Sequence, residues 1–187
     1  MEKHRCGWCK GDELYEAYHD LEWGVAVKDD DRLFEFLVLE SFQAGLSWIT
    51  ILKKRENFRK AFDHFNYKKI SKYDQSKIEA LLQDAGIVRN KLKVNATIGN
   101  AQAFLRIQEE FGSFSNYIWG FVDGKVIKNK VDYYKDAPAT TPLSDSISKD
   151  MKKRGFKFVG STIVYAFMQA TGMVNDHETS CFRYNEV

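Results

Sequence analysis

The sequence contains few cysteines, few prolines and no long apolar run. Among its 187 residues are three cysteines and two prolines. An odd number of cysteines does not suit a framework of paired disulfides. With no cleavable signal and no apolar run of membrane-spanning length in view, we expect a cytoplasmic protein with reduced cysteines and no membrane partner. The cysteines are then expected to be metal ligands, nucleophiles or core residues.

Neither sign of charge dominates the composition. The chain has 28 basic and 26 acidic residues, for a formal net charge of +2 at pH 7. A nucleic-acid surface would therefore depend on local clustering of lysine and arginine, and the totals neither demand nor exclude DNA. Apolar residues make up 44% of the chain and aromatic residues 14%, which is enough for a single domain over 1–187 with a substantial core. Aromatic faces suit stacked bases as well as cores, although core packing explains most of them.

Strand signals are nearly absent, and apolar residues recur at helical spacing between glycines. This pattern predicts an all-α protein that folds as one cooperative unit. Helices are expected over 12–20, 33–42, 47–55, 58–65, 75–84, 90–111, 114–121, 144–154 and 161–172. A loop is expected over 123–143, with room for a short hairpin.

A glycine-bounded, partly apolar turn joins the last two expected helices, over 151–162. Gly155 and Gly160 would let backbone N–H groups approach a phosphate near the positive end of the helix that begins at Ser161. Counter-charge would come from the basic residues of the turn, Lys152, Lys153, Arg154 and Lys157. The alternative is a basic, solvated turn between two core helices, and spacing alone does not decide between the two.

Histidine and cysteine residues near the two ends of the chain could form a metal site. His177 and Cys181 are four residues apart and would share one face of a helix, which makes them a workable ligand pair. Cys6 and His19 could complete a tetrahedron of two cysteines and two histidines, which would be closed and structural. Such a site would hold both ends of the chain in place.

Two further residues near the N-terminus, Cys9 and His4, leave the ligand set open. The spacing of Cys6 and Cys9 also suits a redox dithiol, but the βαβ pattern expected around such a motif is missing. For all of these residues, the competing interpretation is a set of buried thiols and hydrogen-bonded histidines.

A carboxylate on the helix over 33–42 has an apolar setting. Glu40 shares a helix face with Leu33, Leu37 and Ala44, and burial there is costly for a carboxylate without a partner. The alternative is a glutamate near the helix end that points to solvent. Aromatic residues lie on or near the neighbouring helices, namely Trp8, Tyr15, Tyr18, Trp23 and Trp48. Together with one buried acid they could form a pocket for a nucleobase.

Seven segments of the chain together resemble the 3-methyladenine DNA glycosylase I family over essentially the whole length. They are CGW at 6–8, YEAYHD at 15–20, EWGV at 22–25, QAGLSWIT at 43–50, KKREN at 53–57, QDAGI at 83–87 and KKRGFKFVG at 152–160. The resemblance implies an all-helical fold of the helix-hairpin-helix DNA glycosylase superfamily, with the hairpin element near 144–172. It also implies one structural zinc ion that joins the N- and C-terminal segments through Cys6, His19, His177 and Cys181.

The function implied by the resemblance is DNA base excision repair. The enzyme would flip 3-methyladenine out of alkylated double-stranded DNA, hydrolyse its N-glycosidic bond and release free 3-methyladenine. Glu40 and Tyr18 would be the catalytic residues and would hydrogen-bond the base. The walls of the base pocket would be Trp48, Trp8, Trp23 and Tyr15. We further expect an ionised Glu40 that favours the cationic lesion, and a monomeric enzyme.

The resemblance also assigns residues to DNA contact. The turn with Gln43, Gly45 and Leu46 would sit where the flipped nucleotide leaves the stack, with Leu46 as a candidate wedge. The hairpin would contact the backbone through Lys153, Arg154, Gly155, Lys157, Gly160 and Ser161.

The chain departs from the superfamily pattern at one position. In the superfamily the second hairpin helix ends at a Val-Asp-x-His run with a catalytic aspartate, whereas this chain has Val-Asn-Asp-His at 174–177. Asn175 takes the place of the aspartate, although Asp176 leaves a shifted alignment open. Bifunctional members carry a nucleophilic lysine just after the second hairpin glycine, and here Ser161 follows Gly160. We therefore expect a monofunctional enzyme without lyase activity.

Two other protein classes compete with this interpretation. A helix-hairpin-helix DNA-binding protein without catalysis would have no reason to place Glu40 among aromatic residues, and it would release no damaged base. A zinc-dependent hydrolase would need an open coordination position on its metal, and chelation would inactivate it without unfolding.

Overall fold

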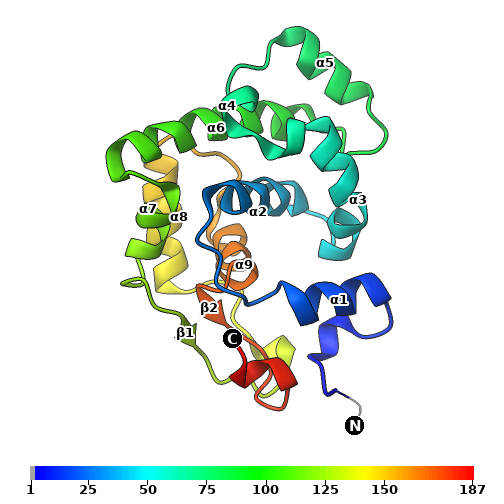
Figure 1. Ribbon diagram of the computed structural model, residues 1–187, viewed down its shortest axis with the longest axis vertical. Coiled ribbons are helices and arrows are strands. Elements are labelled where there is room, and N and C mark those ends of the chain that lie inside the picture. The colour runs from blue at the N-terminus through cyan, green and yellow to red at the C-terminus, as the bar shows by residue number, and fades with distance from the viewer. Residues whose placement is uncertain (1–2) are drawn as a thin grey trace.

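The structure is a computed structural model that describes residues 3–187, and it is mostly helical (Figure 1). Its α-helices are α1 (Glu13–Leu21), α2 (Asp30–Gln43), α3 (Trp48–Ala61), α4 (Tyr67–Ile70), α5 (Gln75–Gln83), α6 (Lys91–Phe111), α7 (Phe114–Gly120), α8 (Pro142–Lys153) and α9 (Ser161–Ala170). Short 3-10 helices are η1 (Gly7–Cys9), η2 (Asp63–Phe65), η3 (Tyr134–Asp136) and η4 (Phe182–Asn185). The prediction of a mostly helical protein is confirmed. Residues 1–2 of the expected single domain lie outside the described residues.

Two short strands lie within the otherwise helical chain. Strand β1 (Ile127–Lys128) pairs in parallel with β2 (Val174–Asn175), in the register Ile127 to Val174 and Lys128 to Asn175. The pairing ties the segment after α7 to the segment after α9, as Figure 1 shows. It replaces the short hairpin for which the expected loop over 123–143 had room.

Side-chain caps fix where several helices begin. The Asp12 carboxylate accepts hydrogen bonds from the backbone N–H groups of Leu14 and Tyr15, so α1 starts at the next residue. Asp29 caps α2 in the same way, and α2 therefore begins at Asp30 rather than at the expected residue 33. A capping box between Thr141 and Ser144 starts α8 at Pro142, ahead of the expected start.

The expected division of 47–65 into two helices is wrong. Helix α3 runs unbroken from Trp48 to Ala61, because the segment between the two expected helices contains neither glycine nor proline. It ends where Asp63, His64 and Phe65 adopt left-handed backbone conformations. Helix α4, which follows, was not among the expected helices.

Helix α2 occupies the centre of the molecule (Figure 1), and it packs against α3, α6, α7 and α9. Every residue from Leu33 to Phe42 is buried, including Glu35 and Glu40. The Glu35 carboxylate is paired with the Arg55 guanidinium at 2.6 Å. Glu40 has no ion-pair partner among residues 3–187. Helix α2 therefore buries one glutamate that is paired and one that is not.

The expected helix that would align His177 with Cys181 is absent from the described structure. Residues 176–181 follow strand β2 as an extended segment and a turn, in which the Cys181 N–H donates to the Glu178 carbonyl at 2.7 Å. The two ends of the chain still meet, because the Phe182 N–H donates to the His4 carbonyl at 2.9 Å. Within residues 3–187, no helix is long and apolar enough to cross a membrane.

Candidate functional site

The predicted pocket residues line one cavity of about 220 Å³. The predicted pocket residues that line it are Trp8, Tyr15, Tyr18, Trp23, Glu40 and Trp48. The remaining lining residues were not assigned to the pocket from the sequence, namely Gln43, which was expected to contact DNA, and Tyr134, Ala137, Ala166, Gln169 and Asp176. Cavities for drug-sized ligands typically measure about 300–1,000 Å³, so this cavity suits one smaller ligand. The predicted lining residues come from η1, α1, the turn after α1, α2 and α3, whereas the others come from the end of α2, η3, the segment after η3, α9 and the segment after β2.

Glu40 places a carboxyl group without a partner at this cavity. The side chain is 3% exposed, and its Oε2 has no hydrogen-bond partner among residues 3–187. Burial raises the pKa of Glu40 to about 8, because desolvation penalises the charged form. The free pocket therefore favours a protonated Glu40 at neutral pH, which differs from the ionised form expected from the sequence. A cation bound beside it would lower the pKa again.

Aromatic rings surround Glu40. The Tyr18 ring lies 5.5 Å from the Trp48 ring between centroids, and Trp8 lies 5.0 Å from Trp23. Burial raises the pKa of Tyr18 well above its ordinary value, so its hydroxyl stays protonated and can donate a hydrogen bond. The Trp48 Nε1–H is also buried and lacks a partner within the described chain. A ligand that offers both a donor and an acceptor would satisfy Glu40 and Trp48 together.

Asn175 and Asp176, the two residues that the sequence left open for a catalytic carboxylate, face different surroundings. Asn175 belongs to the C-terminal segment, where its Nδ2 donates to the carbonyl groups of Tyr184 and Val187 at 3.0 Å each. Asp176 lines the cavity instead. Its carboxylate accepts hydrogen bonds from Asn129 (2.6 Å), Tyr165 (2.7 Å) and Gln169 (2.8 Å). The carboxylate that reaches the cavity from this run is therefore that of Asp176.

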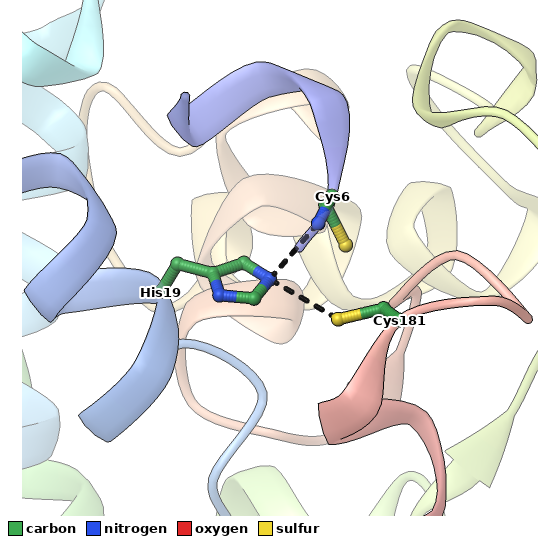
Figure 2. Close-up of side chains that lie close together, drawn as sticks. All are labelled: Cys6, His19 and Cys181. Atoms are coloured by element: carbon green, nitrogen blue, oxygen red, sulfur yellow. Dashed lines mark hydrogen bonds between the residues drawn. The ribbon is translucent and has the colours of Figure 1, made fainter. Parts of the chain in front are cut away.

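Three of the four predicted metal ligands form one buried group. The ligand atoms of Cys6, His19 and Cys181 all lie within 4.8 Å of one another, and Figure 2 shows their side chains converging. His19 Nδ1 lies 2.9 Å from the Asp20 carboxylate, and its Nε2 lies 3.4 Å from the Cys181 sulfur. A carboxylate on the far nitrogen is the arrangement that orients a metal-bound histidine.

His177, the fourth predicted ligand, lies beside this group, with its ring centroid 5.1 Å from that of His19. Because the Asn175 amide nitrogen donates elsewhere, its Oδ1 accepts from His177 Nδ1 at 3.0 Å, which leaves Nε2 without a proton. That Nε2 is buried and has no partner in residues 3–187. Burial lowers the pKa of His177 to about 3, so the ring is neutral. An orphaned, unprotonated nitrogen beside two cysteines and a histidine fits a metal ion.

The remaining cysteine and histidine near the N-terminus lie outside this group. Cys9 is buried, and its thiol donates to the Cys6 carbonyl at 3.2 Å. Burial raises the pKa of Cys9 to about 12, so it remains a thiol. The Cys6 thiol, as a hydrogen-bond donor, lowers the pKa of Cys181 to about 4, which suits a thiolate ligand. The His4 side chain is 54% exposed. These surroundings favour Cys6 and His19 over Cys9 and His4.

The residues expected to contact DNA lie in the turn after α2 and in the hairpin between α8 and α9. Leu46 is 41% exposed, and Gly45 has a φ of +82°, which a side chain would strain. Gly155 has a φ of +95°. The hairpin lysines, Lys153 and Lys157, are exposed. Gly160 and Ser161 form the start of α9 without a side-chain cap.

Arg154 is already occupied by partners within the protein. Its guanidinium pairs with Glu110 and Asp150, at 2.7 Å each, and lies 4.9 Å from the centre of the Phe111 ring. Contact with a phosphate would require Arg154 to exchange one of these carboxylates. The free positive charge of the hairpin therefore rests on its lysines.

Comparison with known proteins identifies the family. A family model described as methyladenine glycosylase matches residues 8–184. The chain is 49% identical over 180 residues to DNA-3-methyladenine glycosylase 1 of Escherichia coli (strain K12), covering 96% of each chain. It is 46% identical over 177 residues to DNA-3-methyladenine glycosylase of Haemophilus influenzae, covering 95% of this chain and 96% of the relative.

Solved structures agree with this result. A crystal structure of 3-methyladenine DNA glycosylase I superposes with a TM-score of 0.93 at 50% identity, covering 96% of this chain and 98% of the other. A Staphylococcus aureus structure described as the basis of 3-methyladenine recognition gives a TM-score of 0.92 at 36% identity, covering 95% of each chain. The chain belongs to the methyladenine glycosylase family. The prediction of a glycosylase that acts on 3-methyladenine in DNA repair is confirmed.

Proposed function

We propose that this chain excises 3-methyladenine from alkylated double-stranded DNA by holding the flipped base in the cavity between α1, α2, α3 and α9. The observation that carries this proposal is a pair of buried polar atoms, Glu40 Oε2 and Trp48 Nε1, that have no hydrogen-bond partner in the described part of the chain and belong to two residues bordering one cavity. The edge of an adenine offers hydrogen-bond donors and acceptors, so it can satisfy both atoms.

The charge of the lesion gives the pocket its selectivity. Methylation at N3 makes the adenine cationic, and a cation over indole or phenol faces gains about 2 kcal/mol or more in a desolvated site. Binding of the cation would also ionise Glu40 by lowering its raised pKa. Neutral adenine lacks both gains. Because the positive charge also activates the base as a leaving group, Glu40 and Tyr18 would act by binding and orienting it.

The turn and the hairpin are the proposed DNA contacts. Leu46, presented by Gln43 and Gly45, would fill the gap left by the flipped nucleotide. The hairpin, with Gly155, Gly160 and Ser161 as its backbone contacts and Lys153 and Lys157 as its cations, would hold a phosphate in a helix-hairpin-helix arrangement. Such contacts set the register of the protein on the duplex without reading sequence.

We also propose that Cys6, His19, His177 and Cys181 hold one zinc ion. The orphaned His177 Nε2 and the grouped ligand atoms of the other three support this proposal. Two sulfur and two nitrogen ligands make a closed, structural site, which would contribute to folding and not to the reaction. Its residues join the two ends of a single domain over 1–187, which we propose acts as a monomer.

Release of free base from methylated duplex DNA tests the proposed activity. We expect the purified protein to release 3-methyladenine, identified by chromatography, and to leave the DNA strands intact. Strand breaks would contradict the monofunctional assignment. No release by folded, metal-loaded protein would indicate a DNA-binding protein without catalysis.

The position of Asp176 makes a further prediction. Its carboxylate, held by three donors, would stabilise positive charge on the sugar or position a water molecule as the base leaves. Asp176→Asn is expected to lower kcat by roughly a hundredfold or more while the binding of free 3-methyladenine changes little. Single-turnover base release and fluorescence titration measure the two effects.

A matched control is Asp132→Asn, because Asp132 is an exposed acid on the neighbouring segment whose carboxylate accepts a hydrogen bond from Thr179 at 2.8 Å and does not line the cavity. It should leave both quantities unchanged. If Asp176→Asn also leaves kcat unchanged, the charge on the leaving base is sufficient and the chain needs no second carboxylate.

A further inference from the structure

Helix α6 carries a line of buried polar side chains. Lys93, Thr97 and Asn100 follow one another at positions i, i+4 and i+7, and they are 7%, 2% and 1% exposed. This spacing places all three on one face of the helix, the face that packs toward the core. Lysine is almost never buried to this degree unless it is paired, and buried polar groups need partners. The partners of Lys93 and Asn100 are the two segments proposed to contact DNA.

Lys93 holds the end of α2. Its Nζ donates to the carbonyl oxygens of Phe42 and Ala44, at 2.7 Å each. The last carbonyls of a helix lack partners within the helix and carry its partial negative charge, so an ammonium group there is doubly favourable. The turn to Leu46 starts at these carbonyls. Lys93 therefore fixes the direction in which this turn leaves α2.

Asn100 holds the hairpin from the same face of α6. Its Nδ2 donates to the Lys157 carbonyl at 2.9 Å, and its Oδ1 accepts from the Lys157 N–H at 2.8 Å. Phe158, the residue after this pair of hydrogen bonds, has a φ of +55°. This backbone conformation is unfavourable for a residue with a large side chain. The paired bonds to Asn100 hold the backbone in place where that strain occurs. Figure 1 shows the connection between α8 and α9 passing beside α6.

Serine side chains also contact the carbonyl groups of the hairpin. Ser148 Oγ, on α8, donates to the Val159 carbonyl at 2.6 Å. With Asn100, this bond turns the carbonyl groups of Lys157 and Val159 toward the protein. Ser41 Oγ, on α2, donates to the Leu37 carbonyl at 2.7 Å and lies 3.3 Å from the Phe158 carbonyl between them. Ser41 directly follows Glu40, so the hairpin contacts the helix residue beside the proposed base-binding acid.

We infer that Lys93 and Asn100 are positioning residues that fix the turn after α2 and the hairpin relative to each other, so that both engage one duplex. The inference rests on the proposed DNA contacts. Seven residues of α-helix span about 10 Å, and a packed helix keeps that separation rigid. Neither side chain would touch DNA. Each would affect DNA binding by fixing the position of the backbone segment to which it is hydrogen-bonded.

Isosteric apolar variants test the inference. Lys93→Met and Asn100→Leu are each expected to raise KM for methylated duplex DNA about tenfold, because a misplaced contact weakens the grip on DNA. Binding of free 3-methyladenine, followed by tryptophan fluorescence, should stay within about twofold. The double variant should raise KM by less than the product of the single effects, because both changes disturb one arrangement.

Gln102→Leu is the matched control on the same helix. Gln102 also donates a side-chain hydrogen bond to a carbonyl, that of Ser71, at 3.0 Å, but it lies on the exposed face. Its KM should not change. Circular dichroism must show each variant folded at the assay temperature. If a variant does not fold, Lys93→Gln or Asn100→Ser, which keeps a polar group, is used in its place. The same changes in KM and in free-base binding are expected of it.

The outcomes separate the inference from the proposal on which it rests. An unchanged KM in both core variants, an equal loss of free-base binding, or an equal effect of Gln102→Leu each overturns the inference. The exposed variants Leu46→Ala and Lys157→Ala test the DNA contacts themselves. If they raise KM while the core variants do not, only the positioning inference fails. If they leave KM unchanged, the proposed contacts fail and the inference fails with them.

Discussion

Replacement of Glu40 with glutamine is expected to lower kcat/KM for 3-methyladenine release by about a hundredfold or more and to stabilise the folded protein. The loss of activity follows because an amide cannot form the ion pair with the cationic base, and an ionic hydrogen bond in a desolvated site is worth several kcal/mol of differential binding. Selectivity over neutral adenine should fall with it.

The gain in stability has a defined dependence on pH. Burial raises the pKa of Glu40 from 4.5 to about 8, so the folded state binds the proton more tightly than the unfolded state does. The contribution of the protonated acid is fully present below pH 4.5 and is lost as the pH rises through 8. A shift of this size corresponds to several kcal/mol of stability. Glutamine does not titrate, so the variant keeps its stability where the parent loses it.

Thermal unfolding of both proteins below pH 4.5 and above pH 8 measures this difference. The rise in Tm on substitution should be larger at the higher pH. Glu35→Gln is the matched control, because Glu35 is also buried on α2 but is paired with Arg55 at 2.6 Å. It should destabilise the protein, since it leaves a buried guanidinium short of a partner. An unchanged lesion preference in the Glu40 variant would remove the proposed role of this residue.

Loss of a metal ligand should have the second large effect, on folding. Cys181→Ala is expected to abolish metal retention and to lower the free energy of unfolding by several kcal/mol, because metal binding and folding are coupled at closed structural sites. Metal analysis of the purified protein and denaturant titration measure the two losses. Cys9→Ala is the control, since Cys9 is equally buried but lies outside the ligand group.

Removal of the proposed metal ion should abolish activity because the terminal segments lose their structure. The Trp8 and Trp23 rings of the cavity pack on the predicted ligands, with Trp8 5.4 Å from His19 and Trp23 4.6 Å from His177 between centroids. Disorder of the terminal segments would therefore open the cavity wall. If a chelator inactivates the protein while circular dichroism shows it fully folded, the metal has a catalytic role and the structural assignment is wrong.

The sequence by itself determined the helical class and most helix positions, and it predicted the aromatic residues and Glu40 that form part of the cavity lining. These follow from local signals, because apolar periodicity, acidic caps and glycine stops act within a few residues. The aromatic residues and Glu40 could be grouped because they occur on neighbouring helices near the N-terminus. Residue types pointed to candidate metal ligands near both ends of the chain, and the family resemblance selected Cys6, His19, His177 and Cys181 among them. The helix expected to align His177 with Cys181 is wrong, because a parallel strand and a turn determine that segment.

Only the tertiary structure decided the electrostatic state of the site and the partners of its residues. The raised pKa of Glu40 depends on its burial where other helices pack on α2, and the sequence of α2 alone does not show how complete that burial is. Whether Asn175 or Asp176 reaches the cavity depends on the direction in which the chain leaves β2. The ion pair of Arg154 with Glu110 joins residues 44 positions apart. The hydrogen bond of Asn100 to Lys157 joins residues 57 positions apart. Such contacts arise from packing between distant segments, so they become visible only when the whole chain is folded.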